Sequence, residues 1–386
     1  MSMPVKTRPR SAGPRRAVVR VFDALCAEAP ATRVGLAHAL GASASTITAA
    51  VHRLQDLGVV ADTGTAPSTG GRRATFVDFA PSLGCVLAVD IGAINVRIAA
   101  ADVGGRIAAR RSYATREVAG GRRLRRAVAA ALDELADAAD GPVLAVAVAV
   151  PAIVDPRTGR ATLSTVPGWP EGEPARWVEH YGAPVLVENE ANLAAVGEAA
   201  RGSGRGARSV LFVAVGAGVG AGLVVNGSLY RGSTGAGGEI GFLVRCGLDS
   251  QTRLEDAAAA PAIARRYREL SGAGDVDAEV VFERAAAGDE RARAVLAETV
   301  RELAIGIANA VLVVDPEVVV VGGGLGAAGP ALIDPLREEI RPLVPHMPRV
   351  VGAELGPEAA LVGCAVWAAR DTQQRLRARL LREART

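Results

Sequence analysis

Lysine, aromatic residues and cysteine are all scarce in this chain of 386 residues. Lys6 is the only lysine among 44 basic residues, and aromatic residues make up 3% of the sequence. The four cysteines lie far apart, and no two of them form a C-x-x-C pair (Cys26, Cys85, Cys246, Cys364). This spacing excludes a disulfide framework and indicates a protein of a reducing compartment.

Long hydrophobic runs are absent as well. The longest apolar runs, such as Val143–Val154, fall short of the about 20 residues that a helix needs to cross a bilayer. The first segment, Met1–Arg20, carries charges but no apolar stretch, which is not typical of a signal peptide. We therefore expect a cytoplasmic protein without a membrane partner.

The charges are unevenly distributed along the chain. The formal net charge is +3, but residues 1–80 hold 10 basic and 5 acidic residues, and the remainder is slightly acidic. A basic N-terminal part followed by a nearly neutral remainder is typical of a protein that binds nucleic acid through its N-terminal part. We expect residues 1–16 to form a disordered basic arm. On charge alone, that arm could equally be a solvated tail without a partner.

Three helices are predicted between residues 17 and 57. Apolar residues at helical spacing mark the first helix, which Pro30 terminates (Val18, Val21, Phe22, Leu25). A second short helix near Arg33–Leu40 leads into the turn Gly41-Ala42-Ser43. Ser43 is a natural N-cap for the third helix, because its side chain can accept from free backbone N–H groups. The third helix carries one apolar stripe (Ile47, Ala50, Val51, Leu54, Leu57).

Two short helices joined by a glycine-containing turn form a helix-turn-helix, in which the second helix reads DNA. Small polar side chains and one arginine lie opposite or beside the apolar stripe of that helix. We predict that they contact phosphates and base edges in a major groove (Ser43, Ser45, Thr46, Ala49, His52, Arg53). The alternative is a helical hairpin that only packs against its neighbours.

The next segment predicts a β-hairpin, or wing. A strand begins at Leu57-Gly58-Val59-Val60, and residues 68–79, STGGRRATFVDF, form a loop that returns into a second strand. Arg72 and Arg73 lie near the tip, where they can reach phosphates or a minor groove. Residues 17–80 are therefore predicted to form a winged helix-turn-helix that binds double-stranded DNA.

The remainder of the chain contains three glycine clusters. A buried strand, Cys85–Ile91, turns back at Gly92 in the segment DIGAINVRIAAAD. A second strand–glycine–strand unit, residues 213–227, has a similar pattern. A third cluster, residues 318–329, follows a predicted strand and precedes a predicted helix. The similarity of the first two units predicts a duplicated α/β fold with a cleft between its halves. Glycine turns and helix N-termini present N–H groups to anions, so each cluster is a candidate phosphate contact.

Several motifs occur in an order that resembles the ROK family, whose name joins repressor, open reading frame and kinase. Along the chain they are STGGRRAT, DIG, VAVPAIVDPRTG, PGW, VENEAN, GAGVGAGL, GSTGAGGEIG and LVVDPEVVVVGGGL. The resemblance implies that residues 83–386 form a two-lobed body of the sugar-kinase/actin-like (ribonuclease H-like) fold. It also implies one of two activities: some members phosphorylate sugars with ATP and magnesium, and others, with a winged helix, are sugar-responsive transcription factors.

Both phosphate hairpins depart from the pattern of the family's kinases. The first keeps Asp90 and Gly92 of D-x-G-G-T-K, but the next two positions are Ala93 and Ile94. A β-branched residue at that tip crowds an anion and offers no hydroxyl. The second hairpin is Gly216-Ala217-Gly218 where the kinases resemble G-T-G. We interpret both as degenerate phosphate loops and expect no cofactor.

The zinc site of the family's kinases is also altered. In the segment GEIGFLVRCGLDSQTRLE, Phe242 stands where the resemblance implies a histidine ligand, and Arg253 where it implies the last cysteine. Cys246 is the only thiol of the segment, and one thiolate cannot hold a tetrahedral zinc. We expect no metal, and Phe242 could instead stack on a sugar face.

The segment VENEAN, residues 187–192, follows an apolar run and brings polar groups to the carboxyl edge of a strand. The resemblance places Glu190 where the kinases have an aspartate that acts as the general base. The longer glutamate displaces the carboxylate by roughly 1 Å, and such a displacement can cost about 10²-fold in rate. We therefore expect no catalytic residue and interpret Glu190 as a ligand contact.

Sugar binding is predicted separately from catalysis. The resemblance implies that an amide and three carboxylates touch the sugar (Asn189, Glu190, Glu239, Glu255). The alternative is that Glu239 and Glu255 are only solvated or cap loops.

Together these observations predict a sequence-specific transcriptional regulator, a repressor of carbohydrate-related genes whose kinase-like body senses a sugar. We expect a homodimer or tetramer on a palindromic operator, because paired reading helices meet half-sites about 34–36 Å apart. One alternative is an ATP-dependent, glucokinase-like sugar kinase with an accessory DNA-binding domain. Another is a DNA-binding protein without a ligand.

Overall fold

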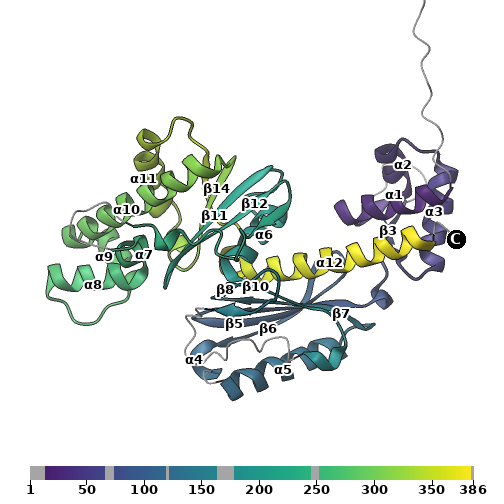
Figure 1. Ribbon diagram of the computed structural model, residues 1–386, viewed down its shortest axis with the longest axis horizontal. Coiled ribbons are helices and arrows are strands. Elements are labelled where there is room, and N and C mark those ends of the chain that lie inside the picture. Colours follow the sequence, from purple (N-terminus) through teal and green to yellow (C-terminus); the bar gives the residue numbers. More distant parts are fainter. Residues whose placement is uncertain (1–13, 66–73, 119–120, 163–177, 245–251, 384–386) are drawn as a thin grey trace, which may run out of the picture.

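The computed structural model describes residues 14–65, 74–118, 121–162, 178–244 and 252–383 (Figure 1). Arg72, Arg73, the PGW motif, Cys246 and most of the predicted basic arm lie outside these ranges. Within them, no single helix is long and apolar enough to cross a membrane. One pair of helices passes that test only when taken together, across a bend of 117°.

The described chain begins with three helices and a three-stranded sheet, which we call the N-terminal module (residues 14–80). Its elements are α1 (Pro14–Ala27), β1 (Ala31–Thr32), α2 (Arg33–Leu40), α3 (Ala44–Asp56), β2 (Val60–Thr65) and β3 (Thr75–Phe79). The strands are antiparallel in the order β1-β3-β2, so β2 and β3 form the predicted hairpin. Helix α1 begins at Pro14, within the residues predicted as a disordered arm.

Local signals place α2 and α3. Gly41 ends α2 in the left-handed conformation (φ 58°), which glycine adopts without strain. The predicted cap of α3 is confirmed, because the Ser43 hydroxyl accepts a hydrogen bond from Thr46 N (3.2 Å). The apolar stripe of α3 is buried as predicted (Ile47, Ala50, Val51, Leu54).

The rest of the chain folds around two five-stranded sheets. The first contains β4 (Cys85–Ile91), β5 (Asn95–Ala101), β6 (Ile107–Ala114), β7 (Val143–Val150) and β10 (Val185–Asn189), in the order β10-β7-β4-β5-β6. The second contains β11 (Ser209–Val215), β12 (Val219–Val225), β13 (Ser228–Tyr230), β14 (Val318–Gly322) and β15 (Arg349–Gly352), in the order β13-β12-β11-β14-β15. A short ribbon pairs β8 (Ile153–Val154) with β9 (Ala161–Thr162).

The two sheets share one topology. In each, the first three strands form an antiparallel meander, and the last two strands run parallel to the first. The duplication predicted from the glycine hairpins is therefore confirmed in the strand order. The third glycine cluster also follows a strand, β14. A 3-10 turn, Leu325–Ala328, precedes the helix α11 (Pro330–Ile340) that the sequence predicts directly after it.

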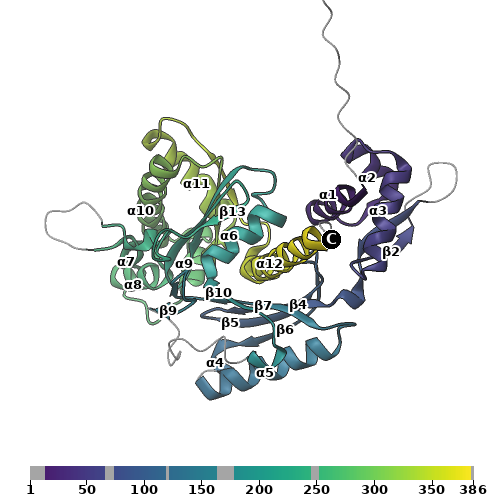
Figure 2. The ribbon, with the colours of Figure 1, turned by 45° about the vertical axis from the view of Figure 1, so that its right-hand side comes forward.

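Helices cover both sheets and fill the space between them (Figures 1 and 2). The outer face of the first sheet is covered by α5 (Gly121–Asp137), after the short α4 (Thr115–Val118). The outer face of the second is covered by α7 (Leu254–Ala258), α8 (Ala260–Ser271), α9 (Ala278–Ala286), α10 (Glu290–Val314) and α11. The apolar cluster between the sheets includes α6 (Glu190–Arg201) and α12 (Ala359–Glu383), which therefore connect the two lobes.

Helices α6 and α12 touch through their backbones, because glycines face the contact. A Cβ on Gly363 would lie 1.8 Å from the carbonyl oxygen of Leu193, so no larger residue fits there. Beyond this contact, α12 continues to the N-terminal module (Figure 1). There Leu380 is 5% exposed and belongs to the apolar cluster of the module.

Candidate functional site

The first glycine hairpin brings a buried carboxyl group and an arginine together. Asp90 lies across the hairpin from Arg97, in register between β4 and β5, and is 3% exposed. The Arg97 Nη1 atom lies 3.1 Å from Asp90 Oδ2. Burial raises the pKa of Asp90 to about 6, although Arg97 opposes the shift. Sequence reasoning missed Arg97, whose signal is a charged residue in an otherwise apolar strand.

The tip of this hairpin is fastened by hydrogen bonds. Gly92 N donates to Asn95 O (3.0 Å), and the Thr115 hydroxyl donates to Gly92 O (2.8 Å). The backbone N–H of Thr115 donates to Ile94 O (2.8 Å), while the Ile94 side chain is 67% exposed. An anion that approached this tip would therefore meet the apolar Ile94 side chain, and the nearby Thr115 hydroxyl already donates to Gly92 O.

The first carboxylate of the VENEAN segment, Glu188, is part of the structural framework. Its side chain is 2% exposed and accepts hydrogen bonds from Arg231 Nε and, at 3.0 Å, from Asn192 Nδ2. The Arg231 guanidinium carbon lies 5.1 Å from the ring centroid of Trp367, on α12. Glu188 thus links β10 to the second lobe, a role that the sequence does not reveal.

Asn189, a predicted sugar contact, is already engaged as the N-cap of α6. Its Oδ1 accepts from the backbone N–H groups of Ala191 (2.8 Å) and Asn192 (3.1 Å). Its Nδ2 donates to Ala152 O (3.1 Å). Only one N–H of the amide remains for a ligand.

Glu190, by contrast, has no hydrogen-bond or ion-pair partner among the described residues. It is the first residue of α6 and faces the first hairpin, since its Oε2 lies 3.9 Å from where a Cβ on Gly92 would stand. Burial, reinforced by the charge of Asp90, raises the pKa of Glu190 to about 8, and Arg97 opposes the shift. Glu190 is therefore mostly protonated at neutral pH, and its carboxyl group can donate one hydrogen bond and accept others.

Two more carboxylates gather at the second hairpin. Glu255 Oε2 accepts a hydrogen bond from Val219 N (2.9 Å), and a Cβ on Gly218 would stand 2.4 Å from the same oxygen. Glu239 is half-buried, and burial together with the negative charge of Glu255 raises its pKa. Glu255 thus fastens the hairpin, whereas no described group satisfies the Glu239 carboxylate.

The segment that carries Glu239 and the start of α6 both lie against β12, a strand of the second hairpin. The N–H of Ala221 donates to the carbonyl of Gly238, which precedes Glu239 (2.8 Å). On the face of the strand, a Cβ on Gly222 would lie 2.5 Å from the carbonyl oxygen of Ala191, in the first turn of α6. The structure therefore brings the predicted ligand residues of α6 and of the second hairpin to one region.

The positions matched to the zinc ligands hold a stacked pair instead. The Arg253 guanidinium carbon lies 4.3 Å from the ring centroid of Phe242. Leu254 N donates to Leu243 O (2.8 Å), which holds the two segments side by side. Arg253 therefore covers one face of Phe242, and that face is closed to the predicted stacking on a sugar. No group of three or more potential ligands (His, Cys, Asp, Glu) in the described part of the chain could hold a metal ion.

The residues predicted to read DNA lie on the outer side of α3. Most of them are exposed, and Thr46 is half-buried (Ser43, Ser45, Thr46, Ala49, His52, Arg53). The hydroxyl of Ser43 is also hydrogen-bonded to those of Ser45 (2.9 Å) and Thr46 (2.8 Å). Beside this face, an ion pair between Arg33 and Asp62 (2.7 Å) joins α2 to β2.

The chain is similar both to proteins named as enzymes and to proteins named as transcriptional regulators. The chain is 40% identical over 209 residues to the bifunctional enzyme NanE/NanK of Brucella melitensis, an alignment that covers 54% of this chain. It spans 39% of that relative's length. It is 27% identical over 340 residues to a protein named "Putative xylose repressor" from Caldicellulosiruptor, covering 81% of this chain and 85% of that protein.

One solved structure resembles nearly the whole chain. It is a ROK family transcriptional regulator described as a homologue of the E. coli MLC protein, with a TM-score of 0.73. The match covers 94% of this chain and 98% of that one at 19% identity, a level at which the likeness shows the fold alone. The ROK family model itself matches residues 86–371. Since that match spans the two sheets and the glycine hairpins described above, this chain belongs to the ROK family.

Proposed function

We propose that this protein is a sequence-specific DNA-binding transcriptional regulator whose ROK-family body senses a sugar. The observation that carries the proposal is the N-terminal module, in which α2, a tight turn, α3 and an antiparallel hairpin follow one another. This is the order of a winged helix-turn-helix, whose second helix enters the major groove. The polar side of α3 is exposed, as a DNA-reading face requires.

We propose further that the regulator represses carbohydrate-related genes and acts as a homodimer or tetramer. The likeness to the "Putative xylose repressor", which extends over 81% of the chain, supports the proposal of repression. Two copies would present two α3 helices to the half-sites of a palindromic operator, about 34–36 Å apart.

The proposed sugar site consists of Glu190, Glu239, Glu255 and the remaining N–H of Asn189. A protonated Glu190 both donates and accepts, and an ionised carboxylate accepts from sugar hydroxyls. The absence of a described partner for Glu190 supports its role as a ligand contact, because a polar group removed from water without a hydrogen bond carries a desolvation cost that a ligand can offset.

Three features of the first hairpin and of Glu190 weigh against efficient phosphoryl transfer. Asp90 is ion-paired with Arg97, and the hairpin tip offers the apolar Ile94. Glu190, at the position of the kinase base, holds its proton at neutral pH because its pKa is raised to about 8. A protonated carboxyl group cannot remove a proton from a sugar hydroxyl.

The DNA-binding function is tested by replacing Arg53, the exposed arginine of α3. Affinity for an operator selected from random DNA should fall about tenfold in Arg53→Ala, as for the loss of one arginine contact. The matched control is Arg126→Ala, which changes an equally exposed arginine on α5 and should leave affinity unaltered. Equal affinities for the unmodified protein and Arg53→Ala would exclude α3 as the reading helix.

The second candidate function is an ATP-dependent sugar kinase with an accessory module, and the 30% identity over 305 residues to a protein named "Glucokinase" from Halalkalibacterium halodurans favours it. We expect no ADP release above background when the protein is supplied with magnesium, ATP and D-xylose, D-glucose or N-acetyl-D-mannosamine. These probes are a pentose, a hexose and a 2-acetamido hexose. Turnover of about 1–100 s⁻¹, ordinary for kinases, would establish the alternative.

A further inference from the structure

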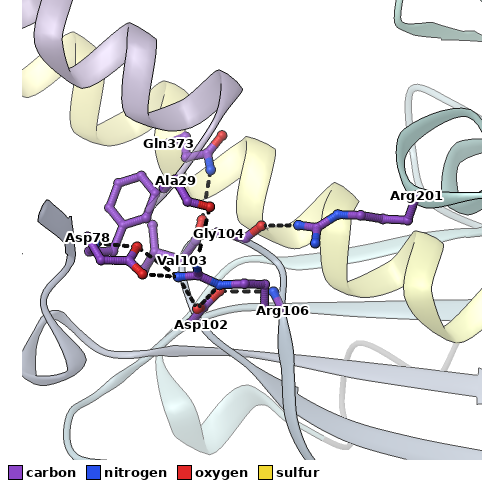
Figure 3. A network of polar contacts seen from close by, with 9 residues as sticks. Ala29, Asp78, Asp102, Val103, Gly104, Arg106, Arg201 and Gln373 are labelled. Carbon is purple, nitrogen blue, oxygen red and sulfur yellow. Dashed lines mark hydrogen bonds and ion pairs between the residues drawn. The ribbon is translucent and has the colours of Figure 1, made fainter. Parts of the chain in front are cut away.

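The N-terminal module is joined to the body by the turn between β5 and β6, and Arg106 is the centre of this joint (Figure 3). Its Nη2 atom lies 2.7 Å from both carboxylate oxygens of Asp78, on β3. Its Nε donates to Asp102 Oδ2 (2.7 Å), and its Nη1 donates to Ala29 O (3.2 Å). One side chain of the body therefore holds two separate segments of the module.

The module depends on this turn for charge balance and for packing. The Asp78 side chain is only 12% exposed, and a buried carboxylate that loses its cation is strongly unfavourable. Val103, within the same turn, is 1% exposed in the apolar cluster of the module. The turn Asp102–Arg106 is thus a part of the module's core, although its flanking strands belong to the first sheet.

Two helices of the body hold the same turn from the other side. Arg201, the last residue of α6, donates from Nη2 to Gly104 O (2.7 Å; Figure 3). Gln373 of α12 donates from Nε2 to Val103 O (2.8 Å). A Cβ on Gly105 would lie 3.2 Å from Val366 Cα, so the turn lies directly against α12.

Helix α6 connects this turn to the proposed sugar site. Glu190 is its first residue and Arg201 its last, and its 12 residues span about 18 Å. The helix lies in the apolar layer between the two sheets. A change in the position of one lobe relative to the other therefore has to move α6 against at least one sheet, and packed layers of this kind shift between discrete arrangements.

We infer that the turn Asp102–Arg106 is the coupling element of the regulator. A sugar bound at the start of α6 changes the contact of Arg201 with Gly104 at its end. Arg106 passes that change to Asp78, and so to β3 and the helices that pack on it. In this role Arg201 and Arg106 are positioning residues that touch neither sugar nor DNA. The inference rests on the proposed function and specifies its regulation.

The test uses Arg201→Gln, which removes the hydrogen bond from the end of α6 to the turn. DNA titrations of the full-length protein, with and without saturating D-xylose, D-glucose or N-acetyl-D-mannosamine, give the factor by which each sugar changes DNA affinity. Such factors are commonly about 5–150. We expect the factor to fall below about twofold in Arg201→Gln, while DNA affinity without sugar and the affinity for the sugar itself stay within about twofold.

A second variant and a matched control separate coupling from loosening of the joint. The double variant Arg106→Gln/Asp78→Asn removes both charges, so no buried carboxylate is left unpaired, and the factor should again fall. The control is Arg377→Gln, which breaks a second ion pair between body and module, Arg377 Nε to Asp23 Oδ1 (2.7 Å). This pair does not contact α6 or the turn, so the control should keep the unmodified factor.

The outcomes distinguish the inference from the proposed function. If sugar changes DNA affinity in Arg201→Gln and in the double variant by the same factor as in the unmodified protein, the inference is overturned. The proposed function as a sugar-responsive regulator is then unaffected. If Arg377→Gln loses the factor as fully as Arg201→Gln, the route through α6 is overturned, because any loosening of the joint then suffices. If no sugar changes DNA binding by the unmodified protein, the proposed function fails, and the inference fails with it.

Discussion

At the scale of single residues, Glu188 and Glu190 carry the same side chain two positions apart but differ in the partners of their carboxyl groups. Glu188 is almost fully buried, yet Arg231 and Asn192 satisfy its carboxylate. Glu190 has no described partner, and burial, reinforced by the charge of Asp90, raises its pKa to about 8. The surroundings therefore make one residue an anchor and leave the other free for a ligand.

Glu190→Gln should stabilise the protein at pH 8 and have little effect at pH 4. The unfolded chain releases the Glu190 proton near the ordinary pKa of 4.5, whereas the folded protein keeps it up to about 8. The contribution of the Glu190 proton to the stability of the folded protein is thus fully present below pH 4.5 and is lost as the pH rises toward 8. Glutamine does not titrate and removes this loss. Because water reaches part of the side chain, we expect a gain of about 1–2 kcal/mol in urea unfolding at pH 8.

The control for this prediction is Glu279→Gln, on the exposed side of α9, which should change stability equally little at both pH values. A gain in Glu190→Gln that is as large at pH 4 as at pH 8 would show that ionisation of Glu190 is not its cause.

At the scale of elements, the contact between α6 and α12 decides how closely the two lobes approach. Each helix presents a glycine: a Cβ on Gly197 would lie 2.3 Å from Ala359 O, and one on Gly363 would lie 1.8 Å from Leu193 O. Glycine in a helix interior is ordinarily unfavourable by about 0.5–1 kcal/mol relative to alanine. Here the close approach of two backbones requires it.

Gly363→Ala should therefore destabilise the protein, against the usual helix preference. We expect a loss of about 2 kcal/mol, typical of overpacking in a core, measured as the free energy of unfolding in urea. Gly274→Ala is the control, because a Cβ there meets no atom within 4 Å and its backbone is not left-handed. Unaltered stability in Gly363→Ala would mean that α6 and α12 can separate without cost.

At the scale of the whole molecule, α12 spans the body and reaches the N-terminal module (Figures 1 and 2). Its first half packs between the sheets, and Leu380 near its end lies in the core of the module. The last helix thus returns to the N-terminal module, and residues of α1 and α12 belong to one apolar cluster. The proposed ligand binding in the body and the proposed DNA binding in the module are therefore expected to be linked thermodynamically.

Glu239→Ala tests this linkage from the ligand side. DNA affinity without sugar should stay within about twofold, since Glu239 lies in the body, while the effect of the sugar on DNA affinity should be lost. Asn189→Ala is less informative, because loss of the α6 cap costs about 0.5–2 kcal/mol of stability. The measurement is a DNA titration with and without D-xylose, D-glucose or N-acetyl-D-mannosamine. Glu338→Ala, exposed on α11, is the control. A full sugar response in Glu239→Ala would remove this residue from the sensing site.

Local patterns in the sequence determined the elements of this protein. The helix Arg33–Leu40, the Ser43 cap and the hairpin turn at Gly92 depend on residues within a few positions of one another. Helical periodicity, capping side chains and glycine act at that range, so they can be recognised without a structure. The motif order likewise sufficed to indicate the ROK family, which the family match confirms.

Only the tertiary structure decided which charges meet. Arg231 lies 43 positions from Glu188, and Arg201 lies 97 positions from Gly104. The raised pKa of Glu190 also follows from what packs around its carboxyl group. Desolvation and ion pairing act through space, between segments that the chain brings together only on folding, and residue types along the sequence do not encode those distances.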